Sequence, residues 1–256
     1  MTMRIVITGA AGRLGSVLSD GLQRPDRDIV RSDLTALPAG RGEAHRVDLT
    51  SYEDVTGLVA GADAVVHLAG IPDEAPFGDL MAANIWATRN VFEAARQAKV
   101  RHVVYASSAH VVGMYRPGEE LGPATPPAPD SMYAVTKLFG ENVAHLYAQK
   151  HGLAATCLRI GSFRPTPENA RQLATWLSPA DAVQLFDRCL DNPPQGMRVL
   201  YGVSANRRSW WVDDAIDSVG YAAADDAELF AADVDVDEFE FQGGPFAQRG
   251  YRGGAG

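Results

Sequence analysis

The stretch MRIVITGAAGRLGSVLSDGL, residues 3–22, decides the fold of this 256-residue chain. It opens with an apolar run rich in β-branched residues, which indicates a buried strand, and it closes with a helix-like segment. Between the two, Gly9, Gly12 and Gly15 allow the backbone to approach a ligand closely. Because the N-terminus of a helix carries partial positive charge, the stretch predicts a phosphate-binding turn.

A carboxylate follows this turn at the distance expected of a dinucleotide site. The glycine spacing differs by one residue from the common G-x-G-x-x-G pattern, but its strand–turn–helix context is the one that the pattern requires. The next strand-like run, DIVRSD, ends in Asp33, about 20 residues further on. A carboxylate there can accept both ribose hydroxyls of NAD and would repel the 2′-phosphate of NADP. We therefore predict NAD as the cofactor; a solvated turn residue is the other interpretation of Asp33.

Strand-like and helix-like segments alternate along the chain, and the alternation weakens after residue 161. This alternation predicts the α/β class, with a doubly wound parallel sheet of the Rossmann type whose ligands bind beyond the carboxyl ends of the strands. We expect one domain over residues 1–256, in which 161–246 form a small C-terminal substrate-binding portion and 247–256 a mobile tail. The further strand-like runs are 64–70, 102–108 and 154–162, and the helix-like segments between them are 51–61 and 80–100.

Composition narrows the possible partners and location. The net charge of −9 argues against nucleic acid, because phosphate backbones require a basic surface. No apolar run is long enough to span a membrane, so we expect no membrane partner. Cys157 and Cys189 show neither metal-ligand spacing nor a disulfide pattern, so we expect no metal and a reducing, cytoplasmic location.

A second stretch, DSMYAVTKLFGEN, residues 130–142, combines a phenol with an ammonium. Tyr133 and Lys137 stand four residues apart, so in a helix they share one face. The apolar residues at helical spacing form a separate stripe, so the pair is not expected to point into the bulk of the core. A chance pair on an amphipathic helix is the alternative. The stripe consists of Val135, Leu138, Phe139, Val143 and Leu146.

Hydroxyls upstream complete a set that can transfer a proton. Ser107 and Ser108 follow the strand-like run HVVYA, and together with TGAAGRLG, YAVTK and SSAHVVG the chain resembles the extended branch of the short-chain dehydrogenase/reductase superfamily. The resemblance implies that Tyr133 is the general base, that Ser108 holds the reacting oxygen and that Lys137 binds the nicotinamide ribose. A nearby ammonium and a positive nicotinamide ring would both favour the phenolate.

The residues predicted to bind the cofactor lie in the glycine-rich turn, at the ends of the strand-like runs and in the proton-transfer set. The predicted cofactor-binding set is Gly9, Gly12, Arg13, Leu14, Gly15, Asp33, Leu34, Asp48, Leu49, Leu68, Ala69, Gly70, Ser107, Tyr133, Lys137 and Ile160.

Within the superfamily, the chain is similar to bacterial uronate dehydrogenases from about residue 3 to 246. The motifs ADAVVHLAGI, SSAH with VVGMY, RIGSF, RQLATWLS, YGVSAN and FQGGPF carry this resemblance. It implies NAD-dependent oxidation of C1 of galacturonate or glucuronate to the aldarolactone, with Arg171 on the substrate carboxylate. A surface position for Arg171 and a packing role for His110 are the alternatives. The implied substrate-binding residues are Pro72, Ser108, Ala109, His110, Tyr133, Ser162 and Arg171.

Three positions depart from that family's pattern. Pro72 stands where those enzymes have Ser, Ala109 where they have Asn, and Phe163 where a smaller residue is typical. Each lost hydrogen bond is worth on the order of 1 kcal/mol, so we expect a less polar pocket. An NAD-dependent sugar epimerase or dehydratase, a dehydrogenase of another aldose and a nucleotide-sensing regulator are the competing functions. The superfamily also implies a homo-oligomer, formed through the helices on either side of the catalytic strand.

Overall fold

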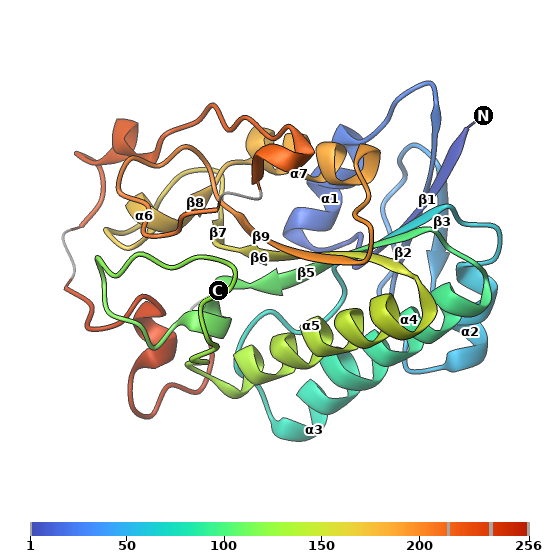
Figure 1. Cartoon of the computed structure of the whole chain (residues 1–256), viewed down its shortest axis with the longest axis horizontal. Coiled ribbons are helices and arrows are strands. Elements are labelled where there is room, and N and C mark those ends of the chain that lie inside the picture. The colour runs from blue at the N-terminus through green and yellow to red at the C-terminus, as the bar shows by residue number, and fades with distance from the viewer. Residues whose placement is uncertain (1, 214–215, 236–237, 255–256) are drawn as a thin grey trace.

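A single parallel sheet organises the molecule (Figure 1). The computed structural model describes residues 2–213, 216–235 and 238–254. Seven strands pair in the order β3-β2-β1-β4-β5-β6-β9, all parallel, which confirms the predicted doubly wound sheet. The strands are β1 (Met3–Thr8), β2 (Arg27–Asp33), β3 (Glu43–Arg46), β4 (Ala64–His67), β5 (His102–Ser108), β6 (Ala154–Ile160) and β9 (Met197–Gly202).

Helices cover both faces of this sheet. One apolar cluster joins the sheet to α2, α4 and α5, and a second joins its other face to α1 and α7 (Figure 1). Burial on both faces explains why the central strands read as nearly continuous apolar runs. The helices are α1 (Arg13–Gly21), α2 (Tyr52–Leu58), α3 (Phe77–Leu80), α4 (Ala87–Gln97), α5 (Met132–His151), α6 (Gln172–Thr175) and α7 (Pro179–Asp191).

The order of strands reverses beside β1. The chain runs outward from β1 through β2 to β3, and then returns to place β4 on the other side of β1. The connections on the two sides therefore diverge, and they leave a crevice at the carboxyl ends of these strands. This is where the predicted phosphate-binding turn lies.

The helix-like segment 80–100 is interrupted by a wider turn. Between α3 and α4 the chain forms a π-helix, η1 (Met81–Trp86), which contains the buried Asn84. The Asn84 side chain exchanges two hydrogen bonds with the backbone of Ile71 and donates to Thr136 Oγ1 at 2.9 Å. The turn thus ties the loop after β4 to α5, and sequence periodicity alone did not predict it.

The burial of α5 differs from the predicted stripe. Val135 is 44% exposed and Leu146 51% exposed, whereas the face carrying Tyr133 and Lys137 is buried. Only Val143 among the stripe residues is fully buried. The helix lies at the edge of the crevice, so its polar face closes a cavity while part of its apolar stripe remains on the surface.

The C-terminal portion continues the main sheet and also forms small elements of its own. The helix α7 leads into β9, which pairs with β6 as another parallel crossover unit. A two-stranded sheet of β7 (Ser162–Phe163) and β8 (Trp176–Leu177) precedes it. None of the helices in the described ranges has both the length and the apolar content that crossing a lipid bilayer requires.

Candidate active site

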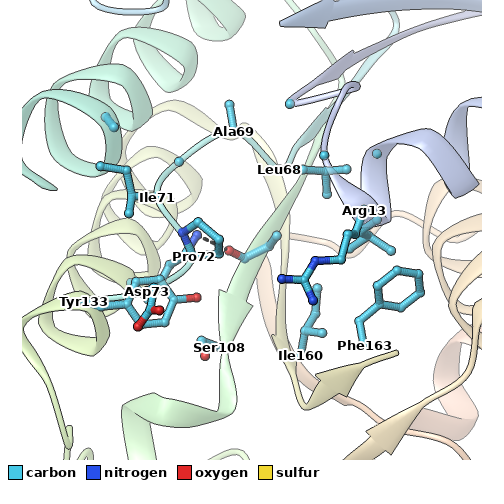
Figure 2. Close-up of a pocket in the computed structure, with 18 of the residues that line it drawn as sticks. Arg13, Leu68, Ala69, Ile71, Pro72, Asp73, Ser108, Tyr133, Ile160 and Phe163 are labelled. Carbon is cyan, nitrogen blue, oxygen red and sulfur yellow. Dashed lines mark hydrogen bonds between the residues drawn. The ribbon is translucent and has the colours of Figure 1, made fainter. Parts of the chain in front are cut away.

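A cavity of about 840 Å³ lies beyond the carboxyl ends of the central strands. Every residue of the predicted site lines it except Ala109. Figure 2 shows the loop after β4, with Ile71, Pro72 and Asp73, beside Tyr133, while Arg13 extends from the glycine-rich turn toward Phe163. The cavity is large enough for a dinucleotide fragment together with a small substrate.

The glycine-rich turn has no room for side chains. Gly9 adopts a φ of 73°, and a Cβ there would lie 2.7 Å from the backbone nitrogen of Ala69. A Cβ on Gly15 would overlap the carbonyl oxygen of Gly9. The backbone therefore closes tightly around the N-terminus of α1, as a site for a pyrophosphate requires.

Asp33 is oriented by three hydrogen bonds at the end of β2. Its carboxylate accepts from the backbone nitrogen of Ala11 at 3.0 Å and from both the backbone and the hydroxyl of Thr35 at 3.0 Å. Its position beside the glycine-rich turn is the one expected of a ribose-binding carboxylate.

Ser108, Tyr133 and Lys137 come together at the centre of the cavity. Their exposed fractions are 4%, 6% and 5%. Lys137 Nζ lies 5.7 Å from the centre of the Tyr133 ring and donates a hydrogen bond to Ala106 O at 3.0 Å. The residues predicted to form the proton-transfer set are therefore neighbours in space.

Burial has the largest effect on the pKa values of Tyr133 and Lys137. It raises the pKa of Tyr133 to about 12, although a hydrogen bond with Ser108 acts in the opposite direction. Burial also lowers the pKa of Lys137 to about 8, because the cavity disfavours its charged form. The two cations were expected to lower the pKa of the phenol, whereas burial raises it here.

Ser107 faces away from the reacting groups. Its hydroxyl donates to Glu141 Oε1 at 2.6 Å, and Glu141 pairs with Arg159 through two further hydrogen bonds, at 3.0 and 2.9 Å. This buried ion pair ties β5 to α5 and β6 directly beneath the cavity. Ser107 therefore lines the cavity mainly through its backbone.

Arg171, directly before α6, also lines the cavity. Its Nε donates to the carbonyl oxygen of Gln242, and its Nη1 donates to Ser162 Oγ at 3.2 Å. Within the described part of the chain, no carboxylate lies within 4 Å of this guanidinium, and burial lowers its pKa to about 10. Gly244, with a φ of 60°, lets the chain turn tightly against the Arg171 side chain. Among the described residues, this cation therefore forms no ion pair, although Asp130 acts on it at longer range and raises its pKa.

His110 lies close to both Tyr133 and Arg171. Its Nδ1 is 2.7 Å from Asp130 Oδ2, its ring stacks on Phe246 at 4.0 Å, and the ring of Tyr133 is 6.1 Å away. Burial lowers the pKa of His110, although the bond to Asp130 acts in the opposite direction. The imidazole is therefore neutral at pH 7.

Ala109, which was predicted to contact the substrate, does not line the cavity. It begins a short 3-10 helix, η2 (Ala109–Val112), whose turn directs Ala109 into an apolar cluster with Tyr201 and Trp211, while His110 lines the cavity. Pro72 and Phe163, the other two departures from the family pattern, do line the cavity.

Sequence reasoning missed the residues that hold the cavity walls. The chain segment after residue 247, expected to be mobile, lies against the loop after β4: Tyr251 donates to Asp73 Oδ1 at 2.7 Å, and the Gly254 backbone donates to Asp73 Oδ2 at 2.8 Å. Glu74 accepts from the Tyr133 backbone at 3.0 Å. Mobility of the segment stays a prediction, and residues 255 and 256 lie outside the described ranges. Asp130, Asn84 and Phe246 were also missed, although Asp130 and Phe246 lie inside quoted motifs.

The described residues were searched for clusters of side chains that could bind a metal ion. Within residues 2–213, 216–235 and 238–254, no group of three or more His, Cys, Asp or Glu side chains is placed to hold a metal ion.

Comparison with known proteins agrees with the geometry. Residues 5–230 match the profile of the NAD dependent epimerase/dehydratase family. The chain belongs to this family. The predicted membership in the extended short-chain dehydrogenase/reductases is thereby confirmed.

Several members of the family are similar over nearly the full length. Uronate dehydrogenase from Pseudomonas syringae pv. tomato is 38% identical, with 96% of this chain and 94% of that protein aligned. Uronate dehydrogenase from Agrobacterium fabrum is 40% identical over 89% and 86% of the two chains. A crystal structure of a uronate dehydrogenase mutant from Agrobacterium tumefaciens, complexed with NAD, has a TM-score of 0.91 at 38% identity, covering 96% and 97%.

Proposed function

We propose that this protein oxidises the C1 hydroxyl of a hexuronate, galacturonate or glucuronate, to the aldarolactone with NAD. The observation that carries the proposal is Arg171, a cation without a carboxylate within 4 Å in the described chain, lining the same cavity as Tyr133. A sugar that carries a carboxylate at one end and a reducing carbon at the other would satisfy both. Similarity to uronate dehydrogenases, one of them with NAD bound, supports the same substrate and cofactor.

The cofactor would occupy the part of the cavity nearest the glycine-rich turn. The residues present fit NAD: the turn would admit a pyrophosphate at the start of α1, Asp33 is oriented to accept ribose hydroxyls, and Lys137 lines the same cavity and would bind the nicotinamide ribose. NAD, when bound, supplies the hydride acceptor and a positive ring. The cofactor contacts are those predicted above from Gly9 to Ile160.

The chain's own residues would handle the proton and orient the sugar. Tyr133 would accept the proton of the C1 hydroxyl as that carbon is oxidised, and Ser108 would hold the same oxygen by a hydrogen bond. The positive charge of bound NAD would lower the pKa of Tyr133 from about 12 toward the neutral pH range. Arg171 would bind the carboxylate, with Ser162 and His110 beside the sugar.

The C-terminal portion, 161–246, would act as the substrate-binding part of a single Rossmann-type domain. It contributes Ser162, Arg171 and Phe246 to the cavity, while the earlier part contributes the proton-transfer set. Pro72 and Phe163 would make the sugar pocket less polar than in the relatives, which predicts a higher KM rather than a different reaction.

The test is the appearance of NADH absorbance with a panel of sugars. Galacturonate and glucuronate should be oxidised with a kcat/KM at least about 10²-fold above that for galactose and glucose, because only the acids satisfy Arg171. Production of free NADH would also exclude an epimerase that recycles its cofactor. Equal rates with neutral sugars would contradict the substrate class, and the absence of NADH with every sugar would contradict the proposed reaction.

Assembly and location are further proposals. The exposed side chains of Trp86, Val135 and Leu146, near and on the helices flanking β5, support a homo-oligomer, which light scattering of the purified protein would detect. Cys157 and Cys189 are free and buried, as suits the reducing cytoplasm that we propose as the location.

A further inference from the structure

Asp130, next to the cavity lining, is a buried carboxylate held in one orientation. Its side chain is 0% exposed, and its Oδ1 accepts from Ser131 Oγ at 2.8 Å. Gly113 and Gly243 flank the other oxygen, and a Cβ on either would overlap it. These two glycines are themselves joined by a backbone hydrogen bond of 2.8 Å, so the carboxylate sits in a closed backbone cradle.

The cradle directs Oδ2 of Asp130 at one partner. That partner is Nδ1 of His110, at 2.7 Å, on a side chain that is 14% exposed and lines the cavity. Because a carboxylate only accepts, Nδ1 must carry the hydrogen. The neutral imidazole then has its lone pair on Nε2, the ring nitrogen for which no partner is found among the described residues.

We propose that Asp130 is a positioning residue that fixes the tautomer of His110, so that Nε2 accepts a hydrogen bond from a substrate hydroxyl. This inference rests on the proposed oxidation of a sugar. It adds that, in one hydrogen bond between protein and substrate, the substrate donates and the protein accepts. Phe246 stacks on His110 at 4.0 Å and holds the plane of the imidazole ring. Asp130 therefore determines which ring nitrogen carries the hydrogen, and Phe246 determines the orientation of the ring. A ligand group that can only accept, such as an ether, would be refused at this position.

The charges around His110 are compatible with a neutral ring. Arg171 faces it from the segment before α6, Asp73 from the loop after β4, and Tyr133 from α5. Arg171 opposes protonation, whereas Asp130 and Asp73 favour it, and burial opposes it most strongly. The acceptor on Nε2 is therefore present at pH 7 and is lost only when acid protonates the ring.

The tautomer can be measured directly on the wild-type protein. Nitrogen NMR of ¹⁵N-histidine-labelled protein, assigned with a His110→Asn variant, should show a protonated Nδ1 and an unprotonated Nε2 at pH 7.5. A hydrogen on Nε2 would overturn the proposal without any need for enzyme activity.

A double-mutant cycle tests the functional role. Asp130→Asn replaces the acceptor by an amide that can hold the wrong tautomer, so the KM for the uronate should rise about tenfold while kcat changes less. In a His110→Ala background the same substitution should change KM by less than about twofold. An equal loss in both backgrounds would show that Asp130 acts on the fold instead and would overturn the proposal.

Two controls distinguish a failure of the proposed role of Asp130 from a failure of the proposed uronate oxidation. The pKa of His110 should fall in Asp130→Asn, because the carboxylate that favours protonation is gone; an unchanged value would contradict the contact. If wild-type protein oxidises no uronate, the proposed function fails, whereas the NMR result still decides whether Asp130 fixes the tautomer.

Discussion

The two ends of the cavity are built in opposite ways. The end that we propose for the nucleotide comes from neighbouring strands and the turns that follow them, with Gly9, Gly15 and Asp33 within one short stretch of chain. The sugar end brings together Asp73, His110, Asp130, Ser162, Arg171 and Phe246, which lie far apart in the sequence. A local site is specified by the strand–turn–helix geometry itself, whereas a dispersed one exists only when the C-terminal portion has packed onto the sheet.

The largest expected effect is a loss of kcat on substitution of Tyr133, which we propose lies between the nucleotide and the sugar. Tyr133→Phe should lower kcat by about 10²- to 10⁴-fold, because the base is removed. NAD affinity, measured by fluorescence titration, should change by less than about twofold. In the wild type, kcat should rise with pH until the phenol ionises, since phenolate is the active form. Retention of most of the activity in the variant would contradict the assignment of Tyr133.

The next effect should be confined to the sugar end. Arg171→Gln should reduce kcat/KM for galacturonate by about 10²- to 10³-fold, because a buried charge pair loses one member. Arg164→Gln is the matched control, since Arg164 also lines the cavity but is already paired with Glu168 at 3.1 Å. Equal losses in the two variants would show that cavity charge in general, rather than Arg171, selects the acid.

A third effect should be confined to the nucleotide end. Asp33→Ser should raise the KM for NAD about tenfold and improve the ratio of NADP to NAD use by about 10- to 100-fold, because hydroxyl acceptors and a repulsive charge are both lost. The KM for the uronate should stay the same. A parallel rise in both KM values would mean that the two ends are not independent.

The smallest effect should come from the rim of the sugar end. Tyr251→Phe removes the hydrogen bond to Asp73, worth about 1 kcal/mol, and should raise the KM for the uronate severalfold without affecting the KM for NAD. Tyr115→Phe removes a comparable bond, to Pro126 O, outside the cavity and serves as the control. Identical kinetics in the Tyr251 variant and the wild type would show that the rim does not shape the pocket.

The same contrast explains what could be predicted from the sequence. The sheet, the glycine-rich turn and the set of Ser108, Tyr133 and Lys137 could be predicted from periodicity and short motifs. In these segments the local backbone geometry determines where each side chain lies. The packing of Ala109 in an apolar cluster was not foreseen, because residue spacing does not reveal the direction of a side chain in a 3-10 turn. Asp73 and Asp130 were missed because their partners, Tyr251 and His110, become neighbours only in the folded chain.

The contact between Gly254 and Asp73 has a practical consequence for handling the protein. That backbone hydrogen bond joins Gly254 to the loop after β4, which lines the cavity. A purification handle or fluorescent fusion placed directly after Gly254 would disturb this wall of the cavity, whereas one placed before Met3 would enter at the start of β1, away from the carboxyl ends of the strands. Preparations intended for kinetic work should therefore carry their handle at the amino end.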